Sequence, residues 1–265
     1  MKIIIFYLTV LFMQSFPVLA ETDAEKGQRL IETALQKTAG FRWTTSKGQM
    51  ILIDAAGNRN ERHFSARVFE QSPNDHWILL VFSFPADVAG TALLTQGKAG
   101  KGFYWLYLPK VKRALRIGGI QKNGAFLASE FSYEDLTLPT PEDYQFLWLA
   151  DEPCPHLLTL SCYKIERRPI SSNSAYSRIV DWLDQESFRT LQSEFYDRKG
   201  ELLKKSSVSG FKLYNQHYWR PEYLKMANMR TGKTTELHWL EHDFDTPVDR
   251  AQFTTRAMET LAHEQ

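Results

Sequence analysis

The segment from His238 to His242 reads H-W-L-E-H and matches H-x-x-E-H, a short zinc-protease motif. That chemistry needs both histidines on one face of a helix, with the glutamate beside a metal-bound water. Here the segment follows a tight turn at residues 230–232 and is rich in residues that favour a strand. On a strand the two histidines share a face, but Glu241 points to the other side. We therefore predict no metal site and no hydrolysis at this motif.

A second pair of candidate groups is Glu134 and Asp135. Neighbouring residues on one helix do not face each other, so these carboxylates cannot form an acid/base pair there. With Ser132 they fit a capping box, and Asp135 is expected to serve a helix start or to bond a loop amide. The chain contains no phosphate-binding loop, dinucleotide fingerprint or serine-nucleophile motif. We predict that the protein is not an enzyme and needs no cofactor.

The only cysteines are Cys154 and Cys162. Two cysteines in an exported protein favour one disulfide, and closing so short a loop contributes on the order of 2.5 kcal/mol. On one straight strand the two residues would lie more than about 20 Å apart, whereas a bridge needs about 6 Å. Residues 155–161 must therefore turn back. A zinc site is not expected, because only His156 lies nearby as another strong ligand.

One basic cluster stands out in a chain with 32 basic and 31 acidic residues. It comprises Lys110, Lys112, Arg113 and Arg116, with Lys122 further along. It is either a solvated turn and edge strand or a patch that contacts a lipid headgroup or a protein partner. The balanced total charge gives no general attraction to nucleic acid, which export would exclude as well.

The first twenty residues have the pattern of a secretory signal peptide. Lys2 precedes an apolar run over residues 3–16, and Val18-Leu19-Ala20 provides a cleavage site before Glu21. The alternative, a retained membrane anchor, fits this pattern less well. No cysteine near the cleavage site could carry a lipid, and no later segment is apolar for long enough to span a bilayer. We expect a soluble periplasmic protein without a lipid anchor.

The remaining pattern predicts one helix followed by ten or eleven short strands. The helix is expected to be capped by Asp23 and to end at Gly40, with an apolar stripe that includes Leu30. The strands at residues 77–84 and 103–108 are apolar on both faces, so they need cover on both sides, or a cavity on one side that is not ordinarily full of water. Further strands are expected at residues 49–54, 62–70, 157–167, 177–184, 188–197, 202–214, 218–229 and 234–244. A short helix is expected at residues 132–136, and residues 140–149 fit a helix or a strand equally well.

We therefore predict a mainly β fold with helices (α+β). A large, curved antiparallel sheet should form an open barrel around the N-terminal helix and short lid helices. No linker-like segment or internal repeat divides the chain, so residues 21–265 are expected to form a single domain.

Several segments resemble the LolA-like outer membrane lipoprotein-sorting proteins of the bacterial periplasm. They are Phe84-Pro85-Ala86-Asp87, Gly90-Thr91-Ala92-Leu93-Leu94, Trp105-Leu106-Tyr107-Leu108-Pro109, residues 129–136, residues 196–204, Trp219-Arg220-Pro221 and residues 226–234. The resemblance covers nearly the whole chain after the predicted cleavage site. It implies a half-open β-barrel that wraps helices and holds a hydrophobic ligand. It also implies lipid or lipoprotein acyl chains as the cargo and an inner-membrane transporter as a second class of partner.

A carrier needs an apolar cavity without buried charge. The candidate wall residues, from the strands that are apolar on both faces, are Phe82, Phe84, Leu93, Leu94, Trp105 and Tyr107. For each of them ordinary packing in the core of a sheet is the alternative. We predict a monomeric periplasmic carrier that binds lipid or lipoprotein acyl chains and passes them between envelope components. The alternative function is a non-carrier envelope protein that docks a membrane transporter or assembly complex through residues 110–116.

Overall fold

The computed structural model describes residues 20–73, 75–97, 102–136 and 140–264. The predicted signal peptide, residues 1–20, lies outside this part of the chain except for Ala20. The helices are α1 (Asp23–Thr38) and α2 (Thr255–His263), and the 3₁₀ turns are η1 (Gly119–Asn123), η2 (Phe126–Ala128), η3 (Glu134–Leu136), η4 (Pro141–Asp143) and η5 (Arg250–Gln252). The strands are β1 (Trp43–Ile53), β2 (Arg59–Ser72), β3 (Asp75–Phe84), β4 (Ala92–Gln96), β5 (Phe103–Leu108), β6 (Arg113–Ile117), β7 (Tyr144–Cys154), β8 (Leu157–Pro169), β9 (Tyr176–Asp184), β10 (Thr190–Asp197), β11 (Leu202–Ser209), β12 (Lys212–Tyr214), β13 (Tyr218–Arg220), β14 (Tyr223–Asn228) and β15 (Thr234–Asp243).

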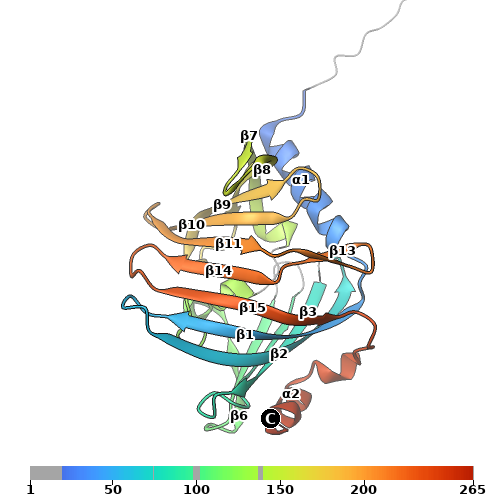
Figure 1. Cartoon of the computed structure of the whole chain (residues 1–265), viewed down its shortest axis with the longest axis vertical. Helices are drawn as coiled ribbons and strands as arrows, with labels where there is room; N and C mark the ends of the chain where they lie inside the picture. The colour runs from blue at the N-terminus through green and yellow to red at the C-terminus, as the bar shows by residue number, and fades with distance from the viewer. Residues whose placement is uncertain (1–19, 74, 98–101, 137–139, 265) are drawn as a thin grey trace, which may run out of the picture.

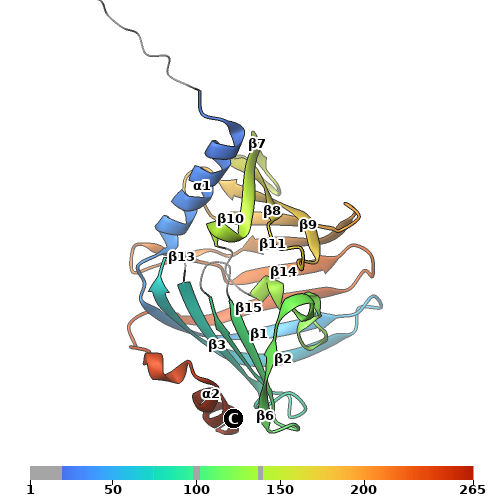
Figure 2. The same ribbon diagram turned by 180° about the vertical axis from the view of Figure 1, so that it is seen from behind.

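One curved sheet forms the body of the protein (Figures 1 and 2). Its thirteen strands follow the order β6-β5-β4-β3-β2-β1-β15-β14-β11-β10-β9-β8-β7, and every neighbouring pair is antiparallel. Strands β6 and β7 are the two ends of this order, so the sheet does not close. The open, curved antiparallel sheet predicted from the sequence is confirmed.

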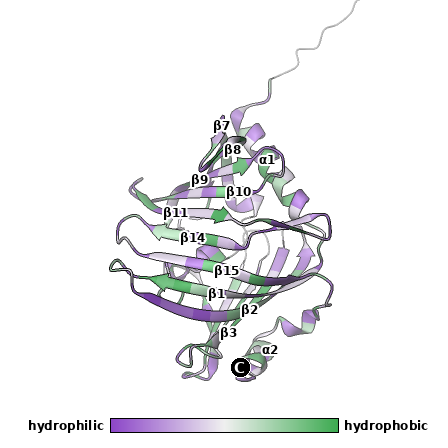
Figure 3. Ribbon diagram, in the orientation of Figure 1, coloured by the Kyte–Doolittle hydropathy of each residue, from purple (hydrophilic) through white to green (hydrophobic). Residues whose placement is uncertain are grey.

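The sheet has an inner and an outer face, because side chains alternate between the two faces along each strand. The strands carry both hydrophobic and hydrophilic residues (Figure 3). Phe64, Phe82 and Leu93 share one core cluster with Ile179 and Phe195, although β2–β4 and β9–β10 lie far apart in the strand order. These strands can meet in this way only inside the curve, so this is the inner face. The outer face at β3–β5 carries a separate apolar cluster.

Helix α1 covers the inner face at the β7–β9 end of the sheet. Leu30 packs there with Phe146, Ile165 and Leu183. Gly27 allows the close approach, because a Cβ at this position would come within 2.8 Å of the backbone nitrogen of Trp148.

The start of α1 was predicted one residue too late. The N-cap is Thr22, not Asp23. The Thr22 hydroxyl accepts a hydrogen bond from the Glu25 amide, and the Glu25 carboxylate accepts one from the Thr22 amide. The helix ends at Thr38, and Gly40 follows with a φ of 93°, as expected for a residue that stops a helix.

Two predicted strands are broken in the structure. Residues 202–214 divide into β11 and β12 around Gly210, which has a φ of 65°, and residues 218–229 divide into β13 and β14 at Pro221. Among the described strands, β12 and β13 pair with each other alone, as a separate hairpin. The segment 140–149, for which helix and strand were both open, is the turn η4 followed by β7.

The short helix predicted at residues 132–136 is only the single turn η3. The hydroxyl of Ser132 lies 3.4 Å from the Tyr176 hydroxyl, and its amide donates to the Asp135 carboxylate. The predicted bond from Asp135 to a backbone amide is confirmed. The serine hydroxyl, however, does not cap a helix.

Helix α2 was not predicted. It covers the outer face of β3–β5, where Phe253, Met258 and Ala262 pack with Leu94 and Tyr107 (Figure 2). Neither helix in the described part of the chain is long and apolar enough to cross a membrane.

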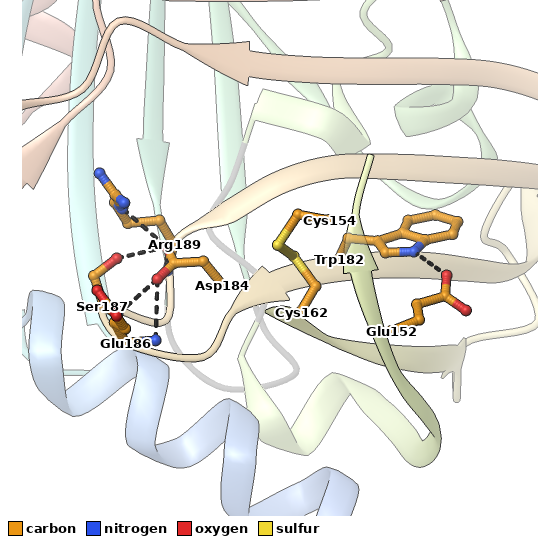
Figure 4. The surroundings of a disulfide bond; sticks show 8 residues. All are labelled: Glu152, Cys154, Cys162, Trp182, Asp184, Glu186, Ser187 and Arg189. Atoms are coloured by element: carbon orange, nitrogen blue, oxygen red, sulfur yellow. Dashed lines mark hydrogen bonds and ion pairs between the residues drawn. A yellow bond between two sulfur atoms is a disulfide. The ribbon is translucent and has the colours of Figure 1, made fainter. Parts of the chain in front are cut away.

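The predicted disulfide between Cys154 and Cys162 is confirmed. The sulfur atoms are 2.06 Å apart and the Cα atoms 5.0 Å apart. The chain turns back at Pro155 and His156, which pairs β7 with β8. Both cysteines are fully buried beside Trp182, whose indole nitrogen donates to Glu152 (Figure 4).

Candidate functional site

The six predicted wall residues do not lie on one wall. Phe82 and Leu93 belong to the inner cluster, whereas Leu94, Trp105 and Tyr107 belong to the outer cluster under α2. The sixth residue, Phe84, ends β3 and is 49% exposed, with its ring centroid 5.0 Å from that of His63. The sequence could have separated the two groups. Side chains alternate along β3–β5, so neighbouring residues such as Leu93 and Leu94 must lie on opposite faces of the sheet.

The apolar inner face is filled by the segment of residues 118–136, here called the plug. Phe126, Phe131 and Tyr133 from this segment are buried in the inner cluster. The ring of Phe126 lies 5.9 Å from that of Phe82 and 5.6 Å from that of Tyr133. Figure 2 shows the plug, in green, on the hollow side of the sheet.

The backbone of the plug is irregular. It consists of three 3₁₀ turns and one isolated bridge between Ala125 and Ser132. Leu127 and Ala128 have φ values of 48° and 62°, in the left-handed region that residues with a side chain seldom adopt. The plug is therefore a strained, irregular cover rather than a regular helix or a strand of the sheet.

Four polar groups, here called the latch, fasten the end of the plug to the sheet. Asp135 accepts from the Tyr176 hydroxyl at 2.8 Å and from the Lys204 ammonium at 3.2 Å. The Lys204 nitrogen also lies 3.1 Å from the Tyr176 oxygen, and Ser132 completes the group. The side chains of Asp135 and Lys204 are only 5% and 11% exposed, so this ion pair is largely withdrawn from water.

Burial raises the pKa of Tyr176 well above its usual value, with the nearby Asp135 carboxylate as the next cause. At neutral pH its hydroxyl therefore remains a hydrogen-bond donor. The sequence analysis missed Tyr176 and Lys204. The sequence did contain an indication of a buried lysine. Lys204 and Lys205 are consecutive on a strand, so their side chains point to opposite faces and cannot both point outward.

Further polar contacts hold the middle of the plug. The guanidinium of Arg62 donates to the carbonyl of Leu127 at 2.6 Å. Its Nε has no partner among the described residues, although Arg62 is only 9% exposed. The amide of Glu130 donates to the Thr235 hydroxyl at 2.9 Å. The amide nitrogen of the Asn228 side chain donates to the Glu130 carboxylate at 2.7 Å.

A cleft of about 290 Å³ opens where the plug meets β7 and the loop between β8 and β9. Glu134 lies in its wall and accepts from the Ser174 hydroxyl at 2.5 Å and the Ala175 amide at 3.1 Å. Burial is the largest influence on this carboxyl and raises its pKa above the usual range. Glu134 and Asp135 therefore serve two different contact sites, as expected for neighbours that cannot form a pair.

The predicted basic patch lies in the turn between β5 and β6 and on β6, at one end of the sheet. Lys110, Lys112, Arg113 and Arg116 are all exposed, and none of them makes an ion pair with another described residue. Lys122 lies apart from this patch. It is partly buried, with its ammonium 4.1 Å from the centre of the Tyr104 ring.

The zinc-protease-like motif lies on strand β15, as predicted. His238 contacts Glu236, Glu241 pairs with Lys47, and His242 lies 3.3 Å from the carbonyl of Pro221. Among the residues that the structure describes, no three histidine, cysteine or acidic side chains are placed to hold a metal ion. The chemistry of this region is that of separate surface contacts.

Comparison with known proteins agrees with this architecture. A family model described as an uncharacterized protein matches residues 74–260. An outer membrane lipoprotein-sorting protein domain from Vibrio parahaemolyticus is 35% identical, with a TM-score of 0.85 over 89% of this chain and 99% of that chain. No curated protein matches the chain.

Two further solved structures are similar. A DUF1329 family protein from Desulfovibrio piger is 27% identical, with a TM-score of 0.83 over 89% of this chain and 99% of that chain. A LolA superfamily protein from Nitrosomonas europaea is 19% identical, with a TM-score of 0.68 over 87% of this chain and 98% of that chain, and shows the shared fold.

Proposed function

Because the chain belongs to the LolA-like family of outer membrane lipoprotein-sorting proteins, we propose that it is a periplasmic carrier. The carrier binds acyl chains of lipids or lipoproteins on the inner face of the sheet and passes them between envelope components. Phe82 and Leu93 are the members of the predicted wall that would contact such a chain. The role is binding and transfer, without a reaction at the bound molecule.

The observation that carries this proposal is the nature of the inner cover. An apolar face is filled by aromatic side chains from a strained, irregular segment that polar contacts hold in place. An acyl chain can replace the buried rings of Phe126, Phe131 and Tyr133 without leaving the face exposed to water. The plug can return when the chain departs, so the empty carrier does not expose its inner face.

The magnitudes suit reversible binding. Each buried CH₂ contributes about 0.8 kcal/mol, so a long acyl chain contributes about 10 kcal/mol. Displacing the three aromatic side chains of the plug exposes them to water, which costs about 2 kcal/mol for each side chain. The difference is a few kcal/mol in favour of the cargo, before the loss of the latch contacts. A partner can overcome a difference of this size during transfer.

The same proposal covers location and assembly. Residues 1–20 would direct the chain to the periplasm and be removed, and residues 21–265 would act as one LolA-like domain and as a monomer. Sequencing of the N-terminus of the exported protein and light scattering of the purified protein test these two points.

The neighbouring residues Leu93 and Leu94 test the carrier proposal. They are 2% and 1% exposed, but Leu93 faces the plug and Leu94 faces α2. Leu93→Ser and Leu94→Ser should both destabilise the protein, whereas only Leu93→Ser should weaken binding of a fluorescent fatty acid per folded molecule. Equal effects on binding would contradict the inner face as the site.

Lipid extraction and mass spectrometry of the protein purified from its own envelope provide a test without a variant. We expect acyl-chain lipids in stoichiometric amounts. A protein that carries no lipid and takes up no fatty-acid probe is not a carrier.

The basic patch supports docking to a membrane transporter or assembly partner, because four exposed cations at one end of the sheet attract an acidic surface. Reversal of Lys112 and Arg113 to glutamate should abolish partner capture while fatty-acid binding is retained. Reversal of Arg198 and Lys199, in another exposed turn, is the matched control. Partner capture that survives mutation of the inner face would favour docking alone as the function.

A further inference from the structure

We propose that Lys204 and Tyr176 form a headgroup subsite that makes the carrier selective for amphiphiles with an anionic oxygen group, a carboxylate or a phosphodiester. This inference rests on the proposed function, since it concerns the state in which cargo has displaced the plug. It assigns to the latch a second role, in which the plug carboxylate occupies the place of the cargo headgroup.

The geometry of Asp135 carries the inference. One oxygen of this carboxylate accepts from the Tyr176 hydroxyl at 2.8 Å, and the other accepts from the Lys204 ammonium at 3.2 Å. Lys204 and Tyr176 belong to strands β11 and β9 of the sheet, whereas Asp135 belongs to the plug. Two donors fixed on the sheet thus hold an anion that is delivered by a removable segment.

Removal of the plug would leave both donors without this partner. With the plug in place, Lys204 and Tyr176 are 8% and 1% exposed as whole residues. In the loaded carrier the acyl chain of the cargo would cover the inner face in place of the plug, so water would replace the lost carboxylate poorly. A buried cation without a partner is strongly unfavourable. The cargo can replace the lost partner of Lys204 by supplying an anionic group. A neutral headgroup cannot do so, and a cationic headgroup would be repelled.

The surroundings place this anion site at the border of an apolar region. The ring of Tyr176 packs against Phe195, with centroids 5.2 Å apart, and both residues belong to the inner cluster with Phe82 and Leu93. A ligand with its anionic group at Lys204 can therefore extend its apolar chain across the inner face. Arg62 is a second inner cation whose partner, the Leu127 carbonyl, belongs to the plug.

The neighbouring lysine provides a matched control. Lys205 lies on the same strand but on the opposite face, where it pairs with Glu194 at 2.7 Å and is 40% exposed. Lys204→Met and Lys205→Met remove the same charge from adjacent positions, so only the direction of the side chain differs.

The test compares three probes with the same fluorescent acyl chain: the free acid, its methyl ester and a lysophosphatidylglycerol. The wild type should bind the acid and the phosphodiester at least tenfold more tightly than the ester, as expected for a buried bond to a charged group. Lys204→Met should abolish this preference, and Lys205→Met should retain it. Tyr176→Phe, which removes only the hydroxyl, should reduce the preference several-fold.

The outcomes separate this inference from the carrier proposal. Equal binding of acid and ester by the wild type, or a preference that Lys204→Met leaves intact, would overturn the headgroup subsite and leave the carrier standing. Binding of none of the three probes would overturn both. Preference for the acid alone assigns the subsite to carboxylates, and preference for both anionic probes assigns it to anionic lipids in general. If Lys204→Met does not fold, the wild-type preference and Tyr176→Phe decide the question.

Discussion

The two faces of the sheet are covered in different ways. On the outer face, α2 is a regular helix that packs Met258 and Ala262, together with Phe253 just before it, onto the strands. On the inner face, the plug has an irregular, strained backbone and depends on buried polar contacts to Lys204, Tyr176 and Arg62. The outer cover also makes polar contacts, since the Ala114 amide donates to the Glu259 carboxylate and the Tyr107 hydroxyl lies 3.0 Å from the His263 ring, but it is a regular helix. The difference between the covers is therefore the irregular, strained backbone and the buried ion pair of the plug, which a ligand with an apolar chain and an anionic group could replace.

The largest expected effect comes from the outer cover. Phe253 is fully buried against the outer cluster. Phe253→Ala should lower the free energy of unfolding by about 4 kcal/mol, through lost burial and the cavity left behind. Urea unfolding measures this loss. Fatty-acid binding per folded molecule should remain unchanged, and a large loss of binding would contradict the separation of the two faces.

The inner cover should respond differently. Asp135→Asn removes a buried charge and leaves Lys204 without its anion, which should cost about 3 kcal/mol. The loss should be local to the plug. Hydrogen exchange should therefore accelerate at amides of residues 118–136, while α2 stays protected, and binding of a hydrophobic dye should rise. Uniform acceleration across both covers would mean that the plug is part of the permanent core.

The disulfide provides a case that belongs to neither cover. It closes a short loop between β7 and β8 and lies with Trp182 and Leu191 in a third cluster. Replacement of both cysteines by serine should lower stability by on the order of 2.5 kcal/mol, since the unfolded chain gains freedom. The ratio of the hydrogen exchange rates at the plug and at α2 should stay the same. Selective loosening of the plug would show that the β7–β8 hairpin supports the inner cover.

The sequence predicted the sheet better than its covers. Alternation, turn residues and the spacing of the cysteines are local signals, and the structure confirms the open antiparallel sheet and the disulfide. The latch is not local, because Asp135 meets a lysine 69 positions later in the chain. The periodic pattern of apolar and polar residues cannot predict a contact between residues so far apart in the chain.

The division of the predicted wall has a similar cause. Leu93 and Leu94 have the same side chain and nearly the same burial, and only the order of strands decides which face lies inside the curve. The strand break at Gly210 was also hard to predict. The sequence pattern of residues 202–214 predicts one continuous strand. Gly210 instead adopts a left-handed conformation, and the residues after it form a separate hairpin.

The smallest expected effect concerns pH and again separates the two covers. Burial raises the pKa of Glu134 above the usual 4.5, despite its bonds to Ser174 and Ala175. Between pH 4.5 and the raised pKa, the folded protein keeps a proton that the unfolded chain has lost. The contribution of this group to stability is therefore fully present below pH 4.5 and is lost as the pH rises through the folded pKa. After correction for the intrinsic pH dependence of amide exchange, the protection of the plug should fall over this interval, whereas the protection of α2 should not change with it. Glu134→Gln cannot titrate, so the plug of this variant should lose the pH dependence. A wild-type slope that persists in Glu134→Gln would assign the effect to another group. The expected result is therefore an inner cover that is held more weakly towards neutral pH than at pH 4.5.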